Sequence, residues 1–409
     1  MSDRYVPRIR ARAASRAALV VAAAACAAAC TSERLSSSER LTLASQPAPG
    51  GERTVLIDDG GRRQPTTRLE VSPVARMPWS GRALPLVAPD GRKAVVETSG
   101  NLPWSVRVGD PLPPEGFETT IEAISLSPSE PGAPLTTLTG AWVLGRAATD
   151  SGFLVERPHE DGARDIAFVG WDGVRRTVVA DGACNAHATA SRDGRMAWCR
   201  RDPEGGDWQL VVEQDGERVA LATEPGTSWL APTFSGDGKG LFAIQLQSTA
   251  LAVAWIPFES GGLPAQSATL SPTLLRSPVS VGGSLSWAVR AMDPVPGLAA
   301  SAPASDRLTF WNPEVRRTAV WLPGSEPERL LPGSMSALVV DPGNALVTLE
   351  ESLVRERLGA RRDSELVDRT RWVLQPTTLS ASDIVGIATG NGQLSIARLT
   401  LSFGEPSPR

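Results

Sequence analysis

The sequence predicts an all-β protein built from repeated four-stranded units. The first observation is a turn signal, usually Asp-Gly or a glycine pair, that recurs seven times, each time before a short apolar run typical of a strand. The second is spacing: successive signals start 60, 43, 44, 45, 59 and 49 residues apart, centred on the length of a β-propeller blade. The third is the abundance of Gly (38) and Pro (34), which many short strands and turns require.

The first 29 residues predict an export signal. Five arginines precede an apolar run that starts at Ala17 and ends at small residues before Cys30. The run is too short to span a bilayer. The motif Ala27-Ala-Ala-Cys30 resembles a bacterial lipobox, although the family usually carries Leu where Ala27 stands. The resemblance implies that Cys30 is acylated and becomes the mature N-terminus; Cys26 and an ordinary signal peptide are the alternatives.

Residues 30–52 predict a flexible tether, because they lack periodicity and are rich in Ser, Pro and Gly. A tether of this length has a root-mean-square reach of ~25 Å, enough to hold a domain just clear of a membrane surface. Two or more acyl chains would anchor it stably. We therefore expect a lipoprotein signal peptide over residues 1–29, a tether over 30–52 and a single β-propeller over 53–409.

Seven turn signals predict seven blades, with six or eight as alternatives because residues 291–306 and 352–372 are irregular. The expected inner-hairpin turns begin at Asp90, Asp150, Asp193, Asp237, Gly282, Asp341 and Gly390. Three of them contain an Asp-Gly pair: Asp90-Gly91, Asp193-Gly194 and Asp237-Gly238. Glycine accepts a positive φ and aspartate accepts backbone hydrogen bonds, so we interpret these pairs as structural.

The outer halves of the blades repeat as well. Residues 165–179 and 208–221 both have the pattern of a strand, an Asp-Gly turn and a strand, and their turns each follow an inner turn by 22 residues. The last predicted inner hairpin has too little chain after it for two more strands, whereas residues 54–61 and 67–71 have the missing form. We expect these N-terminal strands to complete the last blade and close the ring, which removes open sheet edges.

Three turns carry a resemblance to a known repeat. They are Ala88-Pro-Asp-Gly-Arg92, Ser191-Arg-Asp-Gly-Arg195 and Ser235-Gly-Asp-Gly-Lys239, and they look like the signature of TolB-type, WD-like propeller repeats. The sialidase-type Asp-box has an additional residue between Asp and Gly, which is absent here. The resemblance implies the fold but not a role in the Tol system, because here a tether stands where TolB has an α/β domain.

Cys184 and Cys199 are the cysteines that remain after the export signal. In an oxidising compartment an isolated pair is more often a disulfide than a metal site. A symmetric hairpin about Asp193-Gly194 would place Cys199 opposite Ala188, so this candidate disulfide requires the chain before His187 to fold back. Cys184, His187 and Cys199 could instead supply three zinc ligands, but no fourth is evident. We expect no metal and no cofactor.

Side chains suited to catalysis are scarce. His159 and His187 are the two histidines, neither lies in a context typical of a Ser/His/Asp triad, and no Gly-x-Ser-x-Gly motif occurs. We therefore predict no catalytic residue.

Charge and export together define the expected function class. Residues 30–409 contain 36 basic and 44 acidic residues, a net charge of −8 that argues against nucleic acid as a partner. We predict a non-catalytic binding or scaffolding module for protein, peptide or glycan, lipid-anchored to a bacterial membrane, on the periplasmic or surface face of the outer membrane. The alternative is an envelope hydrolase or lyase, which would need two or three channel carboxylates with a raised pKa.

Overall fold

The chain divides into two compact units, and the residues described here belong to the one formed by Leu43–Ile57 and Gln64–Arg409. The computed structural model contains strands and no helix within the described residues, and so no helix able to cross a membrane. The described residues are 52–54, 67–80, 83, 85–101, 116–235, 238–247, 250–259, 264–270, 295–296, 308–312, 317–321, 329–331, 337–341, 344–349, 352–357, 364–370, 372–375, 383–390 and 392–403. The predicted signal, Cys26, Cys30 and nearly all of the tether lie outside them.

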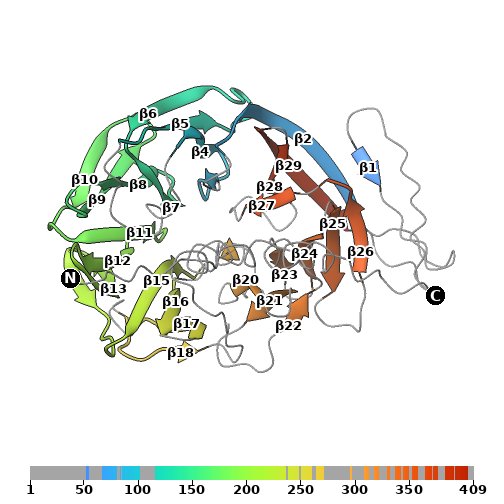
Figure 1. Cartoon of the computed structure of the whole chain (residues 1–409). Helices are drawn as coiled ribbons and strands as arrows, with labels where there is room; N and C mark the ends of the chain where they lie inside the picture. Colours follow the sequence, from blue (N-terminus) through green and yellow to red (C-terminus); the bar gives the residue numbers. More distant parts are fainter. Residues whose placement is uncertain are drawn as a thin grey trace, which may run out of the picture. The chain divides into compact units, whose positions relative to one another are not determined.

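Four sheets are antiparallel meanders of four strands in sequence order (Figure 1). The first is β3 (Leu86–Val87), β4 (Lys93–Gly100), β5 (Thr119–Ser125) and β6 (Pro134–Gly140). The second is β15 (Thr227–Phe234), β16 (Gly240–Gln247), β17 (Ala250–Pro257) and β18 (Thr269–Leu270). The third is β19 (Val295–Pro296), β20 (Leu308–Asn312), β21 (Arg317–Trp321) and β22 (Arg329–Leu331). The fourth is β23 (Ala337–Asp341), β24 (Asn344–Leu349), β25 (Ser352–Arg357) and β26 (Ser364–Asp368).

The largest sheet joins two further meanders through one residue pair. The first meander is β7 (Val143–Ala148), β8 (Gly152–Pro158), β9 (Arg164–Gly170) and β10 (Arg175–Val179). The second is β11 (Cys184–Ala190), β12 (Met196–Asp202), β13 (Gly205–Gln214) and β14 (Glu217–Ala220). Each is antiparallel throughout, and a parallel pair between Cys184 and Arg164 links them. The repeated four-stranded meander is the blade of a β-propeller, so the predicted all-β propeller architecture is confirmed at this level.

The remaining sheet contains strands from both ends of the chain. Its order is β1 (Glu52–Thr54), β2 (Thr67–Pro78), β29 (Gln393–Phe403), β28 (Asp383–Gly390) and β27 (Trp372–Gln375). β2 pairs with β29 from Thr67 opposite Phe403 to Pro78 opposite Gln393. The prediction that Gly390-Asn-Gly392 is an inner-hairpin turn was wrong: it connects β28 to β29, and β27 lies at the sheet edge against β23, the first strand of the preceding sheet.

Aspartate and glycine act together in the turns. In four Asp-Gly pairs the aspartate Oδ1 accepts a hydrogen bond from the amide two residues on, at 2.8–3.1 Å. The glycine of each pair has a positive φ, between 66° and 86°. The four pairs begin at Asp90, Asp161, Asp172 and Asp181. The turn residues therefore satisfy their own backbone, as we predicted for Asp90-Gly91.

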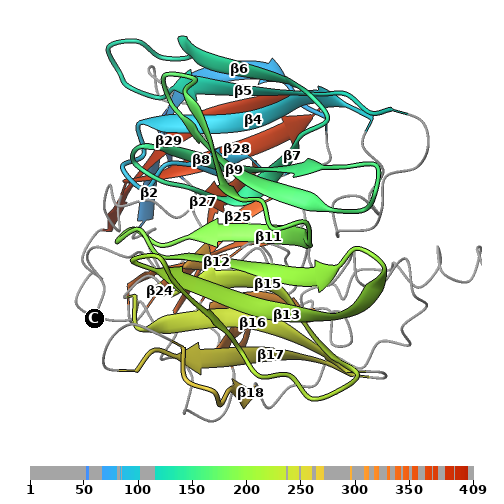
Figure 2. The same ribbon diagram turned by 90° about the vertical axis from the view of Figure 1, so that its left-hand side faces the viewer.

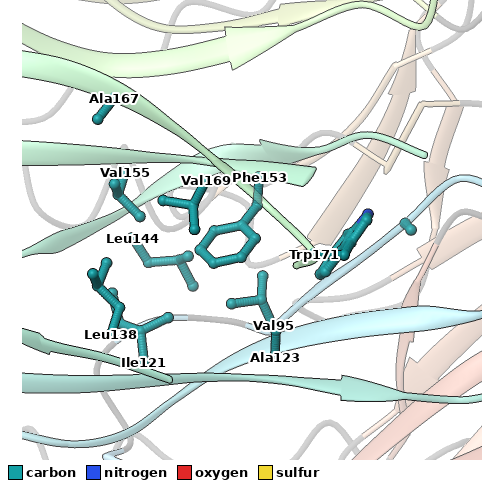
Figure 3. Packing of buried hydrophobic residues seen from close by; sticks show 11 residues of the cluster. Val95, Ile121, Ala123, Leu138, Leu144, Phe153, Val155, Ala167, Val169 and Trp171 are labelled. Atoms are coloured by element: carbon teal, nitrogen blue, oxygen red, sulfur yellow. The ribbon is translucent and has the colours of Figure 1, made fainter. Parts of the chain in front are cut away.

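Apolar residues of neighbouring meanders interlock to form the core. One cluster combines Val95 and Ile121 of the first meander with Leu144, Phe153 and Trp171 of the next. Figure 3 shows the Phe153 ring at its centre, between Leu144 and Trp171. The rings of Phe153 and Trp171 lie 5.4 Å apart at 45°, and Phe153 is fully buried. Burial of such a side chain stabilises the fold by about 1.5–3 kcal/mol, so these contacts hold one meander against the next.

Candidate functional site

The first strands of three successive meanders, β7, β11 and β15, follow one another in space, and the pairing register of each is interrupted by a bulge or irregularity. The bulge of β11 falls between Ala186 and Thr189, and that of β15 between Leu230 and Thr233. His187 and Ala231, the first residue inside each bulge, have φ values of 58° and 50°. The Ala231 amide donates a hydrogen bond to His187 Nδ1 at 3.2 Å, so the two bulges are joined directly.

A buried ion pair supports the β11 bulge from the preceding meander. Glu156 of β8 and Arg164 of β9 are 2% and 1% exposed, and their Oε2 and Nη1 atoms are 2.7 Å apart. The other oxygen, Glu156 Oε1, accepts a hydrogen bond from the Ala188 amide at 3.1 Å. Because both carboxylate oxygens are engaged, Glu156 is a positioning residue and is not free to act as a general acid or base.

The β11 bulge also changes the predicted register of the cysteines. Cys199 lies opposite Ala186, where a symmetric hairpin would have placed Ala188, and Cys184 lies opposite Arg201. In the structure the two cysteines are buried and are not joined in a disulfide. Burial raises the pKa of Cys184, opposed in part by the charges of Arg164 and Arg201. Burial also raises the pKa of Cys199 well above its usual range, so neither thiol is activated.

The metal-ligand set considered from the sequence is not assembled. His187 Nδ1 already accepts the Ala231 amide hydrogen, and no group of three His, Cys, Asp or Glu side chains in the described ranges could hold a metal ion. His159 lies elsewhere, with its Nε2 atom 2.9 Å from Asp165 Oδ2 on β9.

A recess of about 350 Å³ opens where β12 turns into β13, beside the connection from β14 to β15. Residues 200–202 at the end of β12 and residues 223–225 before β15 both line it. Its lining also includes Gly205 and Gly206, which have φ values of 121° and 105° and open space where a Cβ would stand. These glycines leave room that a side chain would fill.

Both arginines of the recess are already engaged. Arg200 Nε lies 2.8 Å from Asp181 Oδ2. Partial burial raises the pKa of Asp181, but hydrogen bonds from Arg200, Asn185 and the Ala183 amide outweigh it and lower the pKa to about 2. The Arg201 guanidinium lies 4.4 Å from the ring centre of Trp208. The guanidinium groups of both arginines therefore contact other side chains of the protein.

One hydrogen-bond acceptor of the recess already binds a protein group, whereas three other residues have acceptors that do not. Asp207 Oδ2 accepts a hydrogen bond from the Gly226 amide at 2.8 Å, which fixes the start of β15. Asp202, Glu224 and Gln209 line the recess with exposed side chains. Within residues 116–235, all of which are described, their side chains make no hydrogen bond to the protein. The recess can thus accept hydrogen bonds from amino or hydroxyl groups of a ligand.

The residues predicted from the repeat lie in turns, away from the recess. Asp90, Gly91, Asp193, Gly194 and Gly238 are all at hairpin ends, and Asp237 lies outside the described residues. Arg195 Nη2 contacts Asp193 Oδ2 at 2.6 Å and donates to the Gly238 carbonyl at 2.8 Å, linking two turns. Partial burial raises the pKa of Asp193, but hydrogen bonds from Arg195 and Ser191 lower it overall.

Sequence reasoning did not find the recess. Its one local signal is the Gly205-Gly206 doublet, which interrupts a strand pattern between two charged residues. A glycine pair of this kind marks a turn, but it does not show which distant loop will face it.

Comparison with known proteins gives no family. No protein-family profile matches the chain, and no characterised protein sequence matches it. Solved structures with a similar fold exist. The β-propeller domain of the trilobed protease from Pyrococcus furiosus shares 11% identity with a TM-score of 0.45, over 80% of this chain and 96% of that one.

Two further structures illustrate the range of these likenesses. The Dos1 propeller shares 9% identity with a TM-score of 0.47, over 80% of this chain and 95% of that one. An oligogalacturonate lyase in complex with manganese shares 11% identity with a TM-score of 0.40, over 78% of this chain and 76% of that one. At such identities and scores the likenesses establish neither an activity nor a partner.

Proposed function

We propose that this chain is a lipid-anchored β-propeller of the bacterial cell envelope that binds a polar segment of a protein, peptide or glycan without catalysing a reaction. The observation that carries the proposal is the recess between the β12–β13 hairpin and the loop before β15, with its three uncommitted acceptors. Loops held by rigid strands are the usual place for recognition in all-β folds. The export signal, the lipobox-like Cys30 and the tether support the location.

The titration behaviour of the carboxylates favours binding over acid–base chemistry. A hydrolase or lyase would need a carboxyl group with a raised pKa. Among the described residues, the two carboxyl groups with a clear pKa shift, Asp181 and Asp193, both have a lowered pKa because arginines, other side chains and backbone amides hydrogen-bond to them. Both remain anions at neutral pH, which suits a structural or recognition role.

We further propose seven blades of TolB-type, WD-like repeat in one ring. The proposal takes β27, β28, β29 and β2 as the last blade, after the six preceding meanders. Pairing between the first and last parts of the chain in that blade would close the ring, as the N-terminal repeat pattern predicts.

Membrane anchoring is tested by cell fractionation. Cys30→Ser should move the protein from membranes to the soluble fraction, whereas Cys26→Ser should leave it bound. A Cys30→Ser protein that stays on membranes would contradict the lipobox assignment.

Recognition by the recess is tested by capture from envelope extracts. Asp202→Lys with Glu224→Lys reverses its two uncommitted carboxylates. Glu130→Lys with Glu217→Lys makes the same charge change at exposed positions elsewhere and serves as the matched control. We expect a ligand retained by the wild type and the control to be lost from the recess variant. Equal capture by all three would refute the assignment of the recess.

A further inference from the structure

The strand connections of two meanders, β7–β10 and β11–β14, fall into two sets. In an antiparallel meander, successive connections lie at alternate ends of the sheet. One set contains the connections β8–β9, β10–β11, β12–β13 and β14–β15, and the other contains β7–β8, β9–β10, β11–β12 and β13–β14. Figure 2 shows β11, β12, β13 and β15 running side by side, with their connections at two opposite ends. The recess lies among the first set, which we call the recess end.

Backbone pairing and polar contacts hold the connections of the recess end together. A parallel pair joins the first residue of β9 to the first residue of β11. Arg200, near the end of β12, contacts Asp181 in the β10–β11 connection at 2.8 Å. Asp207, on β13, accepts the Gly226 amide hydrogen just before β15, also at 2.8 Å. The four connections therefore lie next to one another.

The recess end carries more negative charge than the opposite end. Its four connections, all of them described, contain five acidic residues and no lysine or arginine. The acidic residues are Glu160, Asp161, Asp181, Glu204 and Glu224. The four connections of the opposite end contain four acidic residues and two arginines, Arg192 and Arg195. The formal charges of the two sets are thus −5 and −2, so the recess end attracts cations more strongly.

Within the recess, the groups left for a ligand include acceptors on three different elements. Asp202 ends β12, Gln209 lies on β13 and Glu224 precedes β15. Two of the three are carboxylates, which bind a charged donor more strongly than a neutral one. Arg200 and Arg201 already contact Asp181 and Trp208, so they offer little to an anionic ligand. The recess and the connections around it both favour a cation.

We propose that the recess binds the ammonium group of a lysine side chain in a peptide segment of an envelope protein. The inference rests on the proposed function, because it assigns a ligand class to the same recess. An ammonium group is compact and has three donors, which suits acceptors on three elements, whereas the planar fork of a guanidinium suits the two oxygens of one carboxylate. Gly205 and Gly206 carry no side chain, so the main chain of a peptide can approach closely there.

Chemical modification of the amines in an envelope extract tests the ligand class. The immobilised full chain is exposed to an untreated extract and to one whose primary amines have been acetylated, which removes their charge and leaves guanidinium groups unchanged. We expect the amount of captured protein to fall at least about tenfold after acetylation. Equal capture from both extracts would overturn the inference. Capture that survives protease treatment of the extract would also overturn it, because it would identify a glycan.

Amide variants separate this inference from the proposed function. Asp202→Asn with Glu224→Gln removes both charges but keeps oxygens that accept hydrogen bonds, and Glu130→Gln with Glu217→Gln is the matched control. We expect capture to fall at least about tenfold in the recess variant and to stay at the wild-type level in the control. Capture kept by the amide variant but lost from Asp202→Lys with Glu224→Lys would overturn the ammonium assignment and leave the proposed function standing. Capture kept by both recess variants, or no capture by the wild type, would refute both.

Discussion

Removing one partner of the Glu156–Arg164 pair should destabilise the protein strongly. The two side chains are 2% and 1% exposed and 2.7 Å apart, so Arg164→Met would leave a buried carboxylate without its counter-charge. Breaking a buried pair in this way costs about 3–5 kcal/mol. The equilibrium constant for folding should therefore fall by a factor of about 2 × 10² to 5 × 10³. Glu156→Gln leaves the buried Arg164 charge without its carboxylate. We expect it to lower the free energy of unfolding by a similar amount.

The double variant separates the charge effect from the loss of contacts. Glu156→Gln with Arg164→Met removes both charges of the pair and keeps an oxygen that can accept the Ala188 amide hydrogen. We expect it to be more stable than either single variant. Unfolding in guanidinium chloride, followed by tryptophan fluorescence, measures all three free energies; Trp198 is 1% exposed and will report the change. Additive losses, or a loss below about 1 kcal/mol for Arg164→Met, would refute the reasoning.

Three further outcomes are expected. Gly240→Ala should cost about 1–3 kcal/mol or more, because its Cβ would lie 2.4 Å from the Ile256 carbonyl oxygen; a thermal melt with unchanged midpoint would contradict this contact. The folded-state pKa of Asp181 is lowered to about 2, so its ionised form contributes stability above the unfolded pKa of about 3.9, which is lost as pH falls toward 2. Asp181→Asn should remove that part of the acid sensitivity, and denaturant midpoints at pH 5 and pH 3 measure it. The thiols of Cys184 and Cys199 should resist a thiol reagent in the native protein and react in denaturant; no reaction even in denaturant would mean that they form the predicted disulfide.

Much of the fold could be predicted from local sequence patterns. Asp-Gly turns and their spacing predict the strands, because a turn needs only its own residues to satisfy its backbone. Asp172-Gly173 and Asp215-Gly216 both connect the third and fourth strands of a meander, as the repeat offset predicts. The error at Gly390-Asn-Gly392 has the same origin: a turn signal looks alike between any two strands, and only the sheet order distinguishes the first hairpin from the second.

The candidate site could not be predicted because its parts are distant in sequence or depend on backbone irregularities. The turn shifts the pairing by one residue, since Ala190 lies opposite Met196, and the His187 bulge shifts the residues before it by one more, so the predicted position of Cys199 was two residues off. Nothing in the sequence near position 187 signals that shift, which depends on Glu156 and Ala231 from neighbouring meanders. The recess likewise needs residues 223–225 to face the β12–β13 hairpin, which is a tertiary relation.

Site-specific photocross-linking in intact cells tests the proposed recognition most directly. A photoreactive amino acid at Gln209 lies in the recess, and one at the exposed Glu217 lies on the β13–β14 hairpin of the same meander. The proposed function predicts a discrete envelope adduct from position 209 that position 217 does not give. Identical adducts from both positions, or none from position 209, would contradict binding at the recess.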